Sequence, residues 1–201
     1  MPEETRDRLW MTAMRLFAEK GYQSTSVADI LKAAGVNSGS LYHFFPTKQD
    51  LLVEVLKRYR DGIGPMLLEP AWKGIDDPIE RVFALLAAYR RALAGTECTY
   101  GCPIGSLALE LHEPDPRVRE MLATNFDGWV DAIEKCYVAA RLPHDVDCHA
   151  IAVFTLTTME GGVMQARTRR TPEAFDQSVA MLRDYVTRLQ KDAASTRRAK
   201  T

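Results

Sequence analysis

The 201-residue sequence predicts an all-α protein. Apolar residues recur at helical spacing along most of the chain, and no segment of any length shows the alternation of apolar and polar residues that marks a β-strand. Glycine and proline fall between the apolar segments, where helices begin and end. These three observations lead us to expect about nine helices.

The first 48 residues are expected to form a small three-helix domain. A helix over 3–20 places Leu9, Ala13 and Phe17 on one stripe and ends at Gly21. A second helix follows, because Ser26 and Asp29 have the spacing of a capping box. Gly35 is expected to end that helix in the left-handed conformation.

A third, short helix completes this domain. Asn37 or Ser38 is expected to cap it, and its apolar residues are Leu41, Phe44 and Phe45. The remaining surface is small or hydrogen-bonding, and no acidic residue occurs between Lys32 and Asp50. Two short helices joined by a tight turn, with such a surface on the second, are a helix-turn-helix signature.

Residues 9–56 resemble the N-terminal domain of the TetR (tetracycline repressor)-like transcriptional regulators. The segments that carry the resemblance are AMRLFAEKGYQ (13–23), TSVADIL (25–31) and AAGVNSGSLYHFFPTKQDLL (33–52). They fix turn, aromatic and lysine positions together. The chain departs from the family at Ser38, where Lys, Arg or Pro is frequent, so base contacts at this position are not carried over.

The resemblance implies that Tyr42 and His43 contact DNA, and it favours a phosphate contact for Lys48. Gly39 is expected to let the backbone approach DNA closely. Helix N-termini can hold phosphates, and short polar side chains can read bases. Thr25 and Ser26 could instead be simple caps, and Lys48 an inert surface lysine. The full predicted DNA-binding set is Thr25, Ser26, Asn37, Ser38, Gly39, Ser40, Tyr42, His43 and Lys48.

A helix over 47–61 is expected to connect this domain to a larger one over 62–190, with a loop at 64–77 and a disordered tail at 191–201. In the larger domain, the predicted helix over 145–167 is apolar nearly all round, which favours burial on both sides in a dimer. A central helix in a monomeric bundle is the alternative. The predicted dimer contacts are Phe154, Gly161, Gly162, Phe175, Val179, Leu182 and Val186.

Large side chains in the same domain could line an effector pocket or form plain core. Glu160 could meet a ligand or an arginine across the interface, and Cys102 could be a thiol sensor or an inert cysteine. The candidate effector residues are Trp72, Tyr89, Cys102, Ser106, Glu110, Phe126, Trp129, Met159 and Glu160.

Composition excludes several other classes. The net charge is −1, the four cysteines lack the spacing of a disulfide framework or zinc site, and the charged N-terminus is not a signal peptide. No catalytic triad or phosphate-binding glycine loop occurs, so an enzyme is not expected, and neither a cofactor nor a membrane partner. We expect a cytoplasmic, homodimeric repressor that binds a double-stranded DNA operator and responds to a small-molecule or reactive effector. The alternative is an effector-independent architectural DNA-binding protein.

Overall fold

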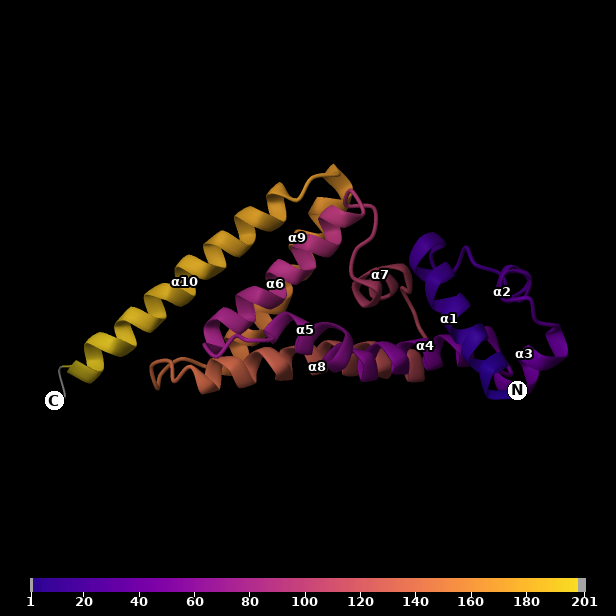
Figure 1. The fold of residues 1–201 in the computed structure, drawn as a ribbon, viewed down its shortest axis with the longest axis horizontal. Coiled ribbons are helices and arrows are strands. Elements are labelled where there is room, and N and C mark those ends of the chain that lie inside the picture. Colours follow the sequence, from indigo (N-terminus) through magenta and orange to yellow (C-terminus); the bar gives the residue numbers. More distant parts are fainter. Residues whose placement is uncertain (1, 199–201) are drawn as a thin grey trace. The chain divides into compact units, whose positions relative to one another are not determined.

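The computed structural model describes the backbone of residues 2–198, and no strand occurs in that range (Figure 1). The all-α prediction is confirmed. The elements in order are α1 (Pro2–Lys20), α2 (Val27–Ala34), α3 (Ser38–Phe44), α4 (Lys48–Ile63), the π-helix η1 (Gly64–Leu68), α5 (Glu69–Trp72), α6 (Pro78–Gly95), α7 (Pro103–Glu110), α8 (Pro116–Ala139), α9 (Cys148–Arg169) and α10 (Glu173–Arg198).

These helices belong to two compact units that the chain enters more than once. The first comprises the chain through Gly62 together with Cys102–Phe126, and the second comprises Ile63–Gly101 together with the chain from Asp127 onward. The sequence prediction placed 102–126 with the larger domain, whereas by contacts this segment belongs with the helix-turn-helix. Helix α8 is continuous across the division and contributes residues to both units.

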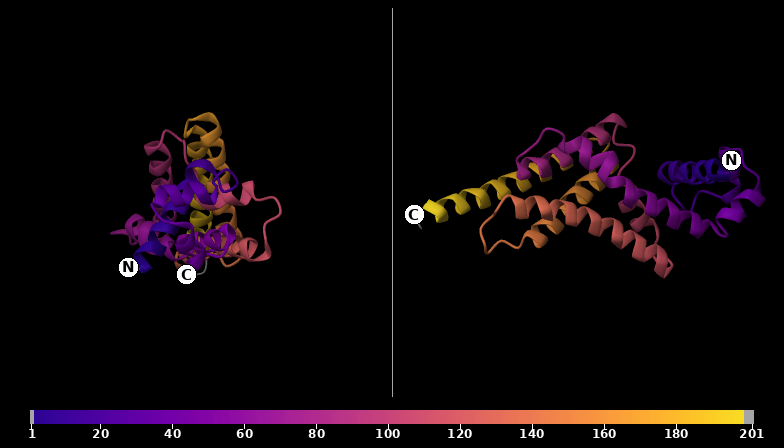
Figure 2. Two further views of the ribbon diagram at one scale, coloured as in Figure 1. Left: turned by 90° about the vertical axis from the view of Figure 1, so that its right-hand side faces the viewer. Right: turned by 60° about the horizontal axis from the view of Figure 1, so that its bottom comes forward.

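The first unit is built around the apolar stripe predicted for α1. Leu9 and Ala13 are fully buried with Ile30 of α2 and Leu41 of α3, so the first three helices share one core. Figure 2 shows the ribbon of these helices at the indigo end of the chain. The buried amide of Asn125, in α8, donates to the backbone carbonyl of Leu56, in α4, at 3.1 Å. Burial of apolar area thus holds this unit together, with a satisfied polar bond inside it.

The second unit is centred on α6, α9 and α10. The Tyr137 hydroxyl lies 2.8 Å from the Thr155 hydroxyl, and both side chains are fully buried. Gly162 of α9 lies against Phe175 of α10, where an added Cβ would come within 2.9 Å of the phenyl ring. The close approach of α9 and α10 therefore depends on glycine at this position.

Two sequence expectations are corrected. Residues 64–72 were predicted as part of a loop but form η1 and α5, and the Trp72 indole N–H donates to the carbonyl of Arg81 at 2.9 Å. The predicted disordered tail is also wrong over 191–198, because α10 continues to Arg198, while residues 199–201 lie outside the described residues. Within the described part of the chain, no helix is both long and apolar enough to cross a membrane.

Candidate nucleic-acid interface and effector cavity

Local capping chemistry builds the helix-turn-helix. The Ser26 hydroxyl accepts from the N–H of Asp29 at 3.1 Å, and the Asp29 carboxylate accepts from the N–H of Ser26 at 2.9 Å, which confirms the predicted capping box. Gly35 ends α2 with φ 63°, the left-handed conformation expected of it. The hydrogen bonds from Ser26 hold the pKa of Asp29 below its usual value.

Helix α3 exposes most of its polar residues. The side chain of Asn37 caps it by accepting from the N–H of Ser40 at 2.9 Å, and Leu41 is fully buried. Tyr42 is 52% exposed, so it lies on the outer face of α3. The exposed residues of this segment are Asn37, Ser38, Gly39, Tyr42 and His43, and Ser40 is half-buried. We call these five exposed residues the recognition face.

Nothing in the protein's own packing excludes a side chain at Gly39. The nearest atom to an added Cβ would be the Asn37 Oδ1 at 3.4 Å, an ordinary contact distance. The fold therefore gives no internal reason for glycine here, unlike at Gly162.

Partners inside the protein are also found for Thr25, Glu110 and Lys48. Thr25 is fully buried, and its hydroxyl donates to the carbonyls of Gly21 at 2.7 Å and Leu16 at 3.3 Å, so we correct its predicted phosphate contact to a structural role. Glu110 accepts from the backbone N–H groups of Tyr22 and Gln23, so the expectation that it fixes an effector is also corrected.

Lys48 is the third of these residues. Its ammonium donates to the Tyr22 carbonyl and lies 4.0 Å from the centroid of the Tyr22 ring. Partial burial lowers the pKa of Lys48, and the nearby Glu110 carboxylate opposes that shift. In this structure the ammonium is directed to the turn before α2.

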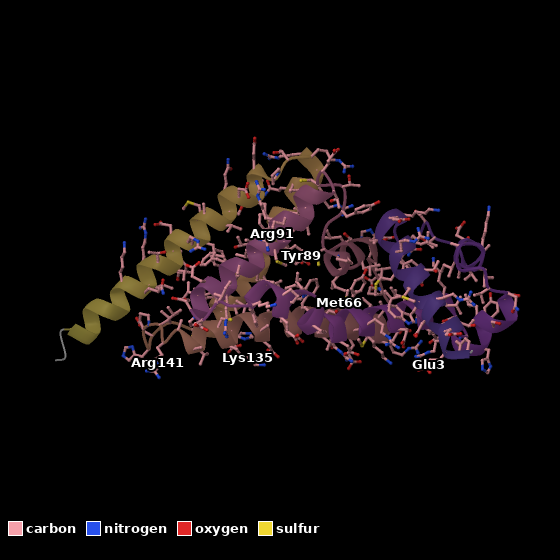
Figure 3. All side chains as sticks on the ribbon, viewed as in Figure 1. Glu3, Met66, Tyr89, Arg91, Lys135 and Arg141 are labelled. Carbon is pink, nitrogen blue, oxygen red and sulfur yellow. The ribbon has the colours of Figure 1, made fainter. Side chains whose placement is uncertain are left out.

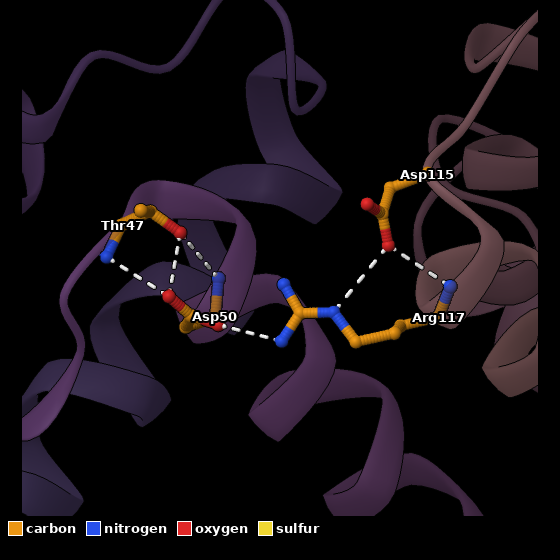
Figure 4. A network of polar contacts seen from close by, with 4 residues as sticks. All are labelled: Thr47, Asp50, Asp115 and Arg117. Atoms are coloured by element: carbon orange, nitrogen blue, oxygen red, sulfur yellow. Dashed lines mark hydrogen bonds and ion pairs between the residues drawn. The ribbon is translucent and has the colours of Figure 1, made fainter.

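A second set of charged residues surrounds the start of α4 (Figure 4). Thr47 and Asp50 cap this helix, with the Thr47 hydroxyl donating to Asp50 at 2.7 Å. Arg117, in the first turn of α8, donates to the other Asp50 oxygen at 3.1 Å and lies 3.4 Å from Asp115. The hydrogen bond from Thr47, with that from Arg117, lowers the pKa of Asp50.

The second unit contains a cavity of about 440 Å³. Its apolar surface comes from Leu68 and Trp72, while Arg81, Asp131 and Lys135 supply charge. Figure 3 labels Lys135 on α8. The remaining lining residues are Pro78, Gly128, Ala132, Cys136 and Ala139.

Of the predicted effector residues, this cavity includes Trp72 alone. Tyr89 and Trp129 pack edge to face with ring centroids 5.6 Å apart, and Met159 is fully buried. Cys102, Ser106, Glu110 and Phe126 fall in the first unit, and Glu160 is half-buried on α9. The sequence did not predict Arg81 and Lys135 as cavity residues. Their only signal was a basic side chain on each of two mostly apolar helices.

Cys102 is only 2% exposed, and its sulfur caps α7 by accepting from the N–H of Gly105 at 3.5 Å. Whether the thiol senses electrophiles stays a prediction.

The predicted dimer residues divide into core and surface. Phe175, Leu182 and Val186 are at most 1% exposed, and Gly162 is buried against Phe175, so these four pack within the chain and their assignment to the interface is corrected. Phe154 is 50% exposed, Gly161 faces open space, and Val179 is half-buried.

Five large apolar side chains are exposed on α9 and α10: Val153, Phe154, Met164, Met181 and Tyr185. We call them the α9–α10 apolar patch. Within it, the rings of Phe154 and Tyr185 meet at 90° with centroids 6.3 Å apart. Large apolar side chains exposed on two helices that pack together are candidates for an interaction surface.

Both parts of the chain match families of known proteins. Residues 11–55 match the model of the bacterial regulatory proteins of the tetR family, and residues 78–181 match that of the LmrA/YxaF-like transcriptional regulator C-terminal domain.

Among the described residues, no cluster of three or more His, Cys, Asp or Glu could hold a metal ion.

Individual relatives agree over nearly the full length. The chain is 30% identical to the uncharacterized HTH-type transcriptional regulator Rv0196 of Mycobacterium tuberculosis, over 90% of this chain and 93% of that protein. It is 26% identical to the HTH-type transcriptional repressor DhaR of a Mycobacterium species, over 88% and 89%. The solved structure of a TetR regulatory protein from Rhodobacter sphaeroides superposes with a TM-score of 0.79 at 25% identity, covering 88% of this chain and 95% of that one.

Proposed function

The chain belongs to the TetR family of transcriptional regulators, and on that premise we propose that it binds a near-palindromic DNA operator as a homodimer and represses transcription. The observation that carries the proposal is the recognition face, a polar and uncharged surface without an acidic residue on a short exposed helix. Such a surface can enter a major groove without repulsion from phosphates. The repressor name of the similar DhaR supports repression as the direction.

The recognition face has two kinds of groups for DNA. Asn37 and Ser38 offer short hydrogen-bonding side chains to base edges, although the Asn37 oxygen already caps α3. Tyr42 and His43 follow one turn later, where a phenol and an imidazole can donate to phosphates. Gly39 lies between these two pairs of residues and leaves the helix start open to the DNA backbone.

The dimer would use the α9–α10 apolar patch. A single helix-turn-helix reads one half-site, whereas two copies related by a twofold axis read half-sites about 34 Å apart. Phe154 and Tyr185 provide large aromatic surfaces of the kind enriched at interface centres. Gly161, with open space beside it, allows a partner helix to approach closely.

The cavity is the site we propose for the effector. Arg81 and Lys135 face one acidic residue, Asp131, so the charged lining favours an anion. The Arg81 Nε–H donates to the Ile75 carbonyl at 2.7 Å, which holds the guanidinium in place. Leu68 and Trp72 favour an apolar or planar group, and together these residues fit a small carboxylate or phosphate ester with an apolar body.

Helix α8 contributes residues both to the cavity and to the DNA-binding unit. Asp131 and Lys135 lie in its second half, and Arg117, which bonds Asp50, lies in its first turn. An effector that favours a different setting of α8 would therefore act on the start of α4. Such coupling between two sites is typically worth about 1–3 kcal/mol.

A mobility-shift titration on the DNA that flanks the protein's own gene tests the proposal. We expect a sequence-specific complex that resists competitor DNA of random sequence and dissociates with one class of apolar anions. Arg81→Gln should raise the effector concentration needed for release without changing operator affinity. Equal affinity for the flanking and random DNA would contradict operator binding, and specific binding that no anion reverses would favour the effector-independent alternative.

A further inference from the structure

The last residue of α7 is bonded to the turn that precedes the helix-turn-helix. Glu110 accepts from the backbone N–H of Tyr22 at 2.9 Å through one carboxylate oxygen, and from the N–H of Gln23 at 2.6 Å through the other. The partners are 88 and 87 residues apart in sequence. A charged acceptor on two adjacent N–H groups forms stronger hydrogen bonds than a neutral one.

The turn is shaped to receive this carboxylate. Gly21 has φ 87°, a conformation that L side chains rarely adopt, and an added Cβ would lie 3.0 Å from each Glu110 oxygen. Glycine therefore serves two needs here, the left-handed backbone and the room for the carboxylate.

Lys48 joins the same group from the other side of the helix-turn-helix. It is the first residue of α4, and its ammonium bonds the Tyr22 carbonyl close to Glu110. The residues that precede α2 and those that follow α3 are thus gathered at one carboxylate. Glu110 and Lys48 meet at Tyr22, which accepts from Lys48 and donates to Glu110.

We propose that Glu110 is a positioning residue for operator binding: it holds the Tyr22–Gln23 turn and, through Tyr22, Lys48, so that α2 and α3 are set for the DNA. This inference rests on the DNA-binding function proposed above. Glu110 itself contacts no DNA in this account, and its charge would repel phosphates. If Glu110 positions the helix-turn-helix, removing its charge weakens DNA binding. Loss of electrostatic repulsion alone would strengthen it.

The experiment compares operator binding of Glu110→Gln with that of Glu113→Gln. Both changes remove one negative charge from the same segment, and Glu113 is exposed. General electrostatics would make both variants bind DNA more tightly. We expect Glu110→Gln to weaken operator binding about tenfold, with an unchanged salt dependence, and Glu113→Gln to differ from wild type by less than about twofold.

Two further measurements separate positioning from loss of folding. Hydrogen exchange should accelerate at the amides of Tyr22 and Gln23 in Glu110→Gln, while protection around the buried Leu9 in α1 and Leu56 in α4, which belong to the same unit, is unchanged. Glu110→Asp keeps the charge but shortens the side chain, and we expect it to weaken operator binding as Glu110→Gln does.

The inference is overturned if Glu110→Gln binds the operator as tightly as wild type, if Glu110→Asp behaves as wild type, or if weaker binding comes with lost protection around Leu9 and Leu56. Failure of the proposed function is distinguishable, because wild type would then show no preference for any operator, while exchange at Tyr22 and Gln23 would still report the Glu110 contact.

Discussion

Helices α3 and α9 show how differently one chain uses its helices. Helix α3 is seven residues long and buries only Leu41, and a capping asparagine sets its start. Helix α9 is 22 residues long and buries residues along its whole length, from Ile151 to Ala166. The short helix contributes little to folding at its exposed positions, which leaves them available for recognition. In the long helix the same apolar character serves both the core and the exposed patch.

The difference between buried and exposed side chains is tested most strongly at Phe154 and Phe175, both predicted from sequence as dimer contacts. Phe175 is 1% exposed and packs on Gly162, so Phe175→Ala should lower the free energy of unfolding by about 3–5 kcal/mol. Chemical denaturation monitored by circular dichroism would measure the loss. A change below about 1 kcal/mol would place Phe175 outside the core.

Phe154 should respond differently, because half of its side chain is exposed. Phe154→Glu places a charge in the α9–α10 apolar patch, and we expect the dimer to dissociate while helix content is retained. Sedimentation velocity would show the change in mass, and operator affinity should fall about 100-fold because one half-site is lost. Thr168→Glu, also exposed on α9, is the control and should stay dimeric. A dimeric Phe154→Glu protein would show that the patch is not the interface.

On α3, Gly39→Ala separates recognition from folding. The added methyl meets only an ordinary contact with Asn37, so stability should change by less than about 1 kcal/mol. Operator affinity should nevertheless fall about tenfold if DNA approaches the backbone at this residue. Unchanged affinity in a fluorescence anisotropy titration would remove Gly39 from the recognition face.

The smallest expected effect concerns the caps on either side of α3. The pKa values of Asp29 and Asp50 are lowered, chiefly by hydrogen bonds from Ser26 and Thr47. A carboxylate with a lowered pKa stabilises the fold above its unfolded pKa of about 3.9, and this contribution is lost as pH falls through the folded pKa.

Thr47→Ala should accordingly lower the melting temperature slightly near pH 7, because it removes the hydroxyl that bonds Asp50. The difference from wild type should shrink below about pH 4, where Asp50 becomes protonated in both proteins. Thermal melts at a series of pH values would check this. A difference that is constant down to pH 2 would contradict the assigned role of the carboxylate.

What the sequence could predict follows from the range of the interactions. Ser26, Gly35 and Asn37 act on residues within one helical turn, so their capping roles could be predicted and are confirmed. The Glu110 contact joins residues nearly ninety positions apart, and no local pattern indicates it. The same holds for the cavity, whose basic residues come from α6 and α8.

Helix α9 shows the other limit. Because it is apolar nearly all round, periodicity could not separate Phe154 from the buried Met159, and the neighbouring Phe175 and Leu182 were wrongly assigned to the surface. In residues 64–72, Gly64 and Pro65 favoured a loop, but Ile63 keeps helical backbone angles and the chain continues from α4 into η1 without a break.

The proposed function requires the recognition faces of two chains to bind one DNA duplex. The most direct test is an anisotropy titration of wild type and Tyr42→Ala on the flanking operator, with complex stoichiometry measured in parallel. Tyr42 is 52% exposed, so its removal should leave the melting temperature unchanged. We expect a complex of two chains per operator for wild type and at least about tenfold weaker binding for Tyr42→Ala. Equal binding by both proteins, or one chain per operator, would contradict it.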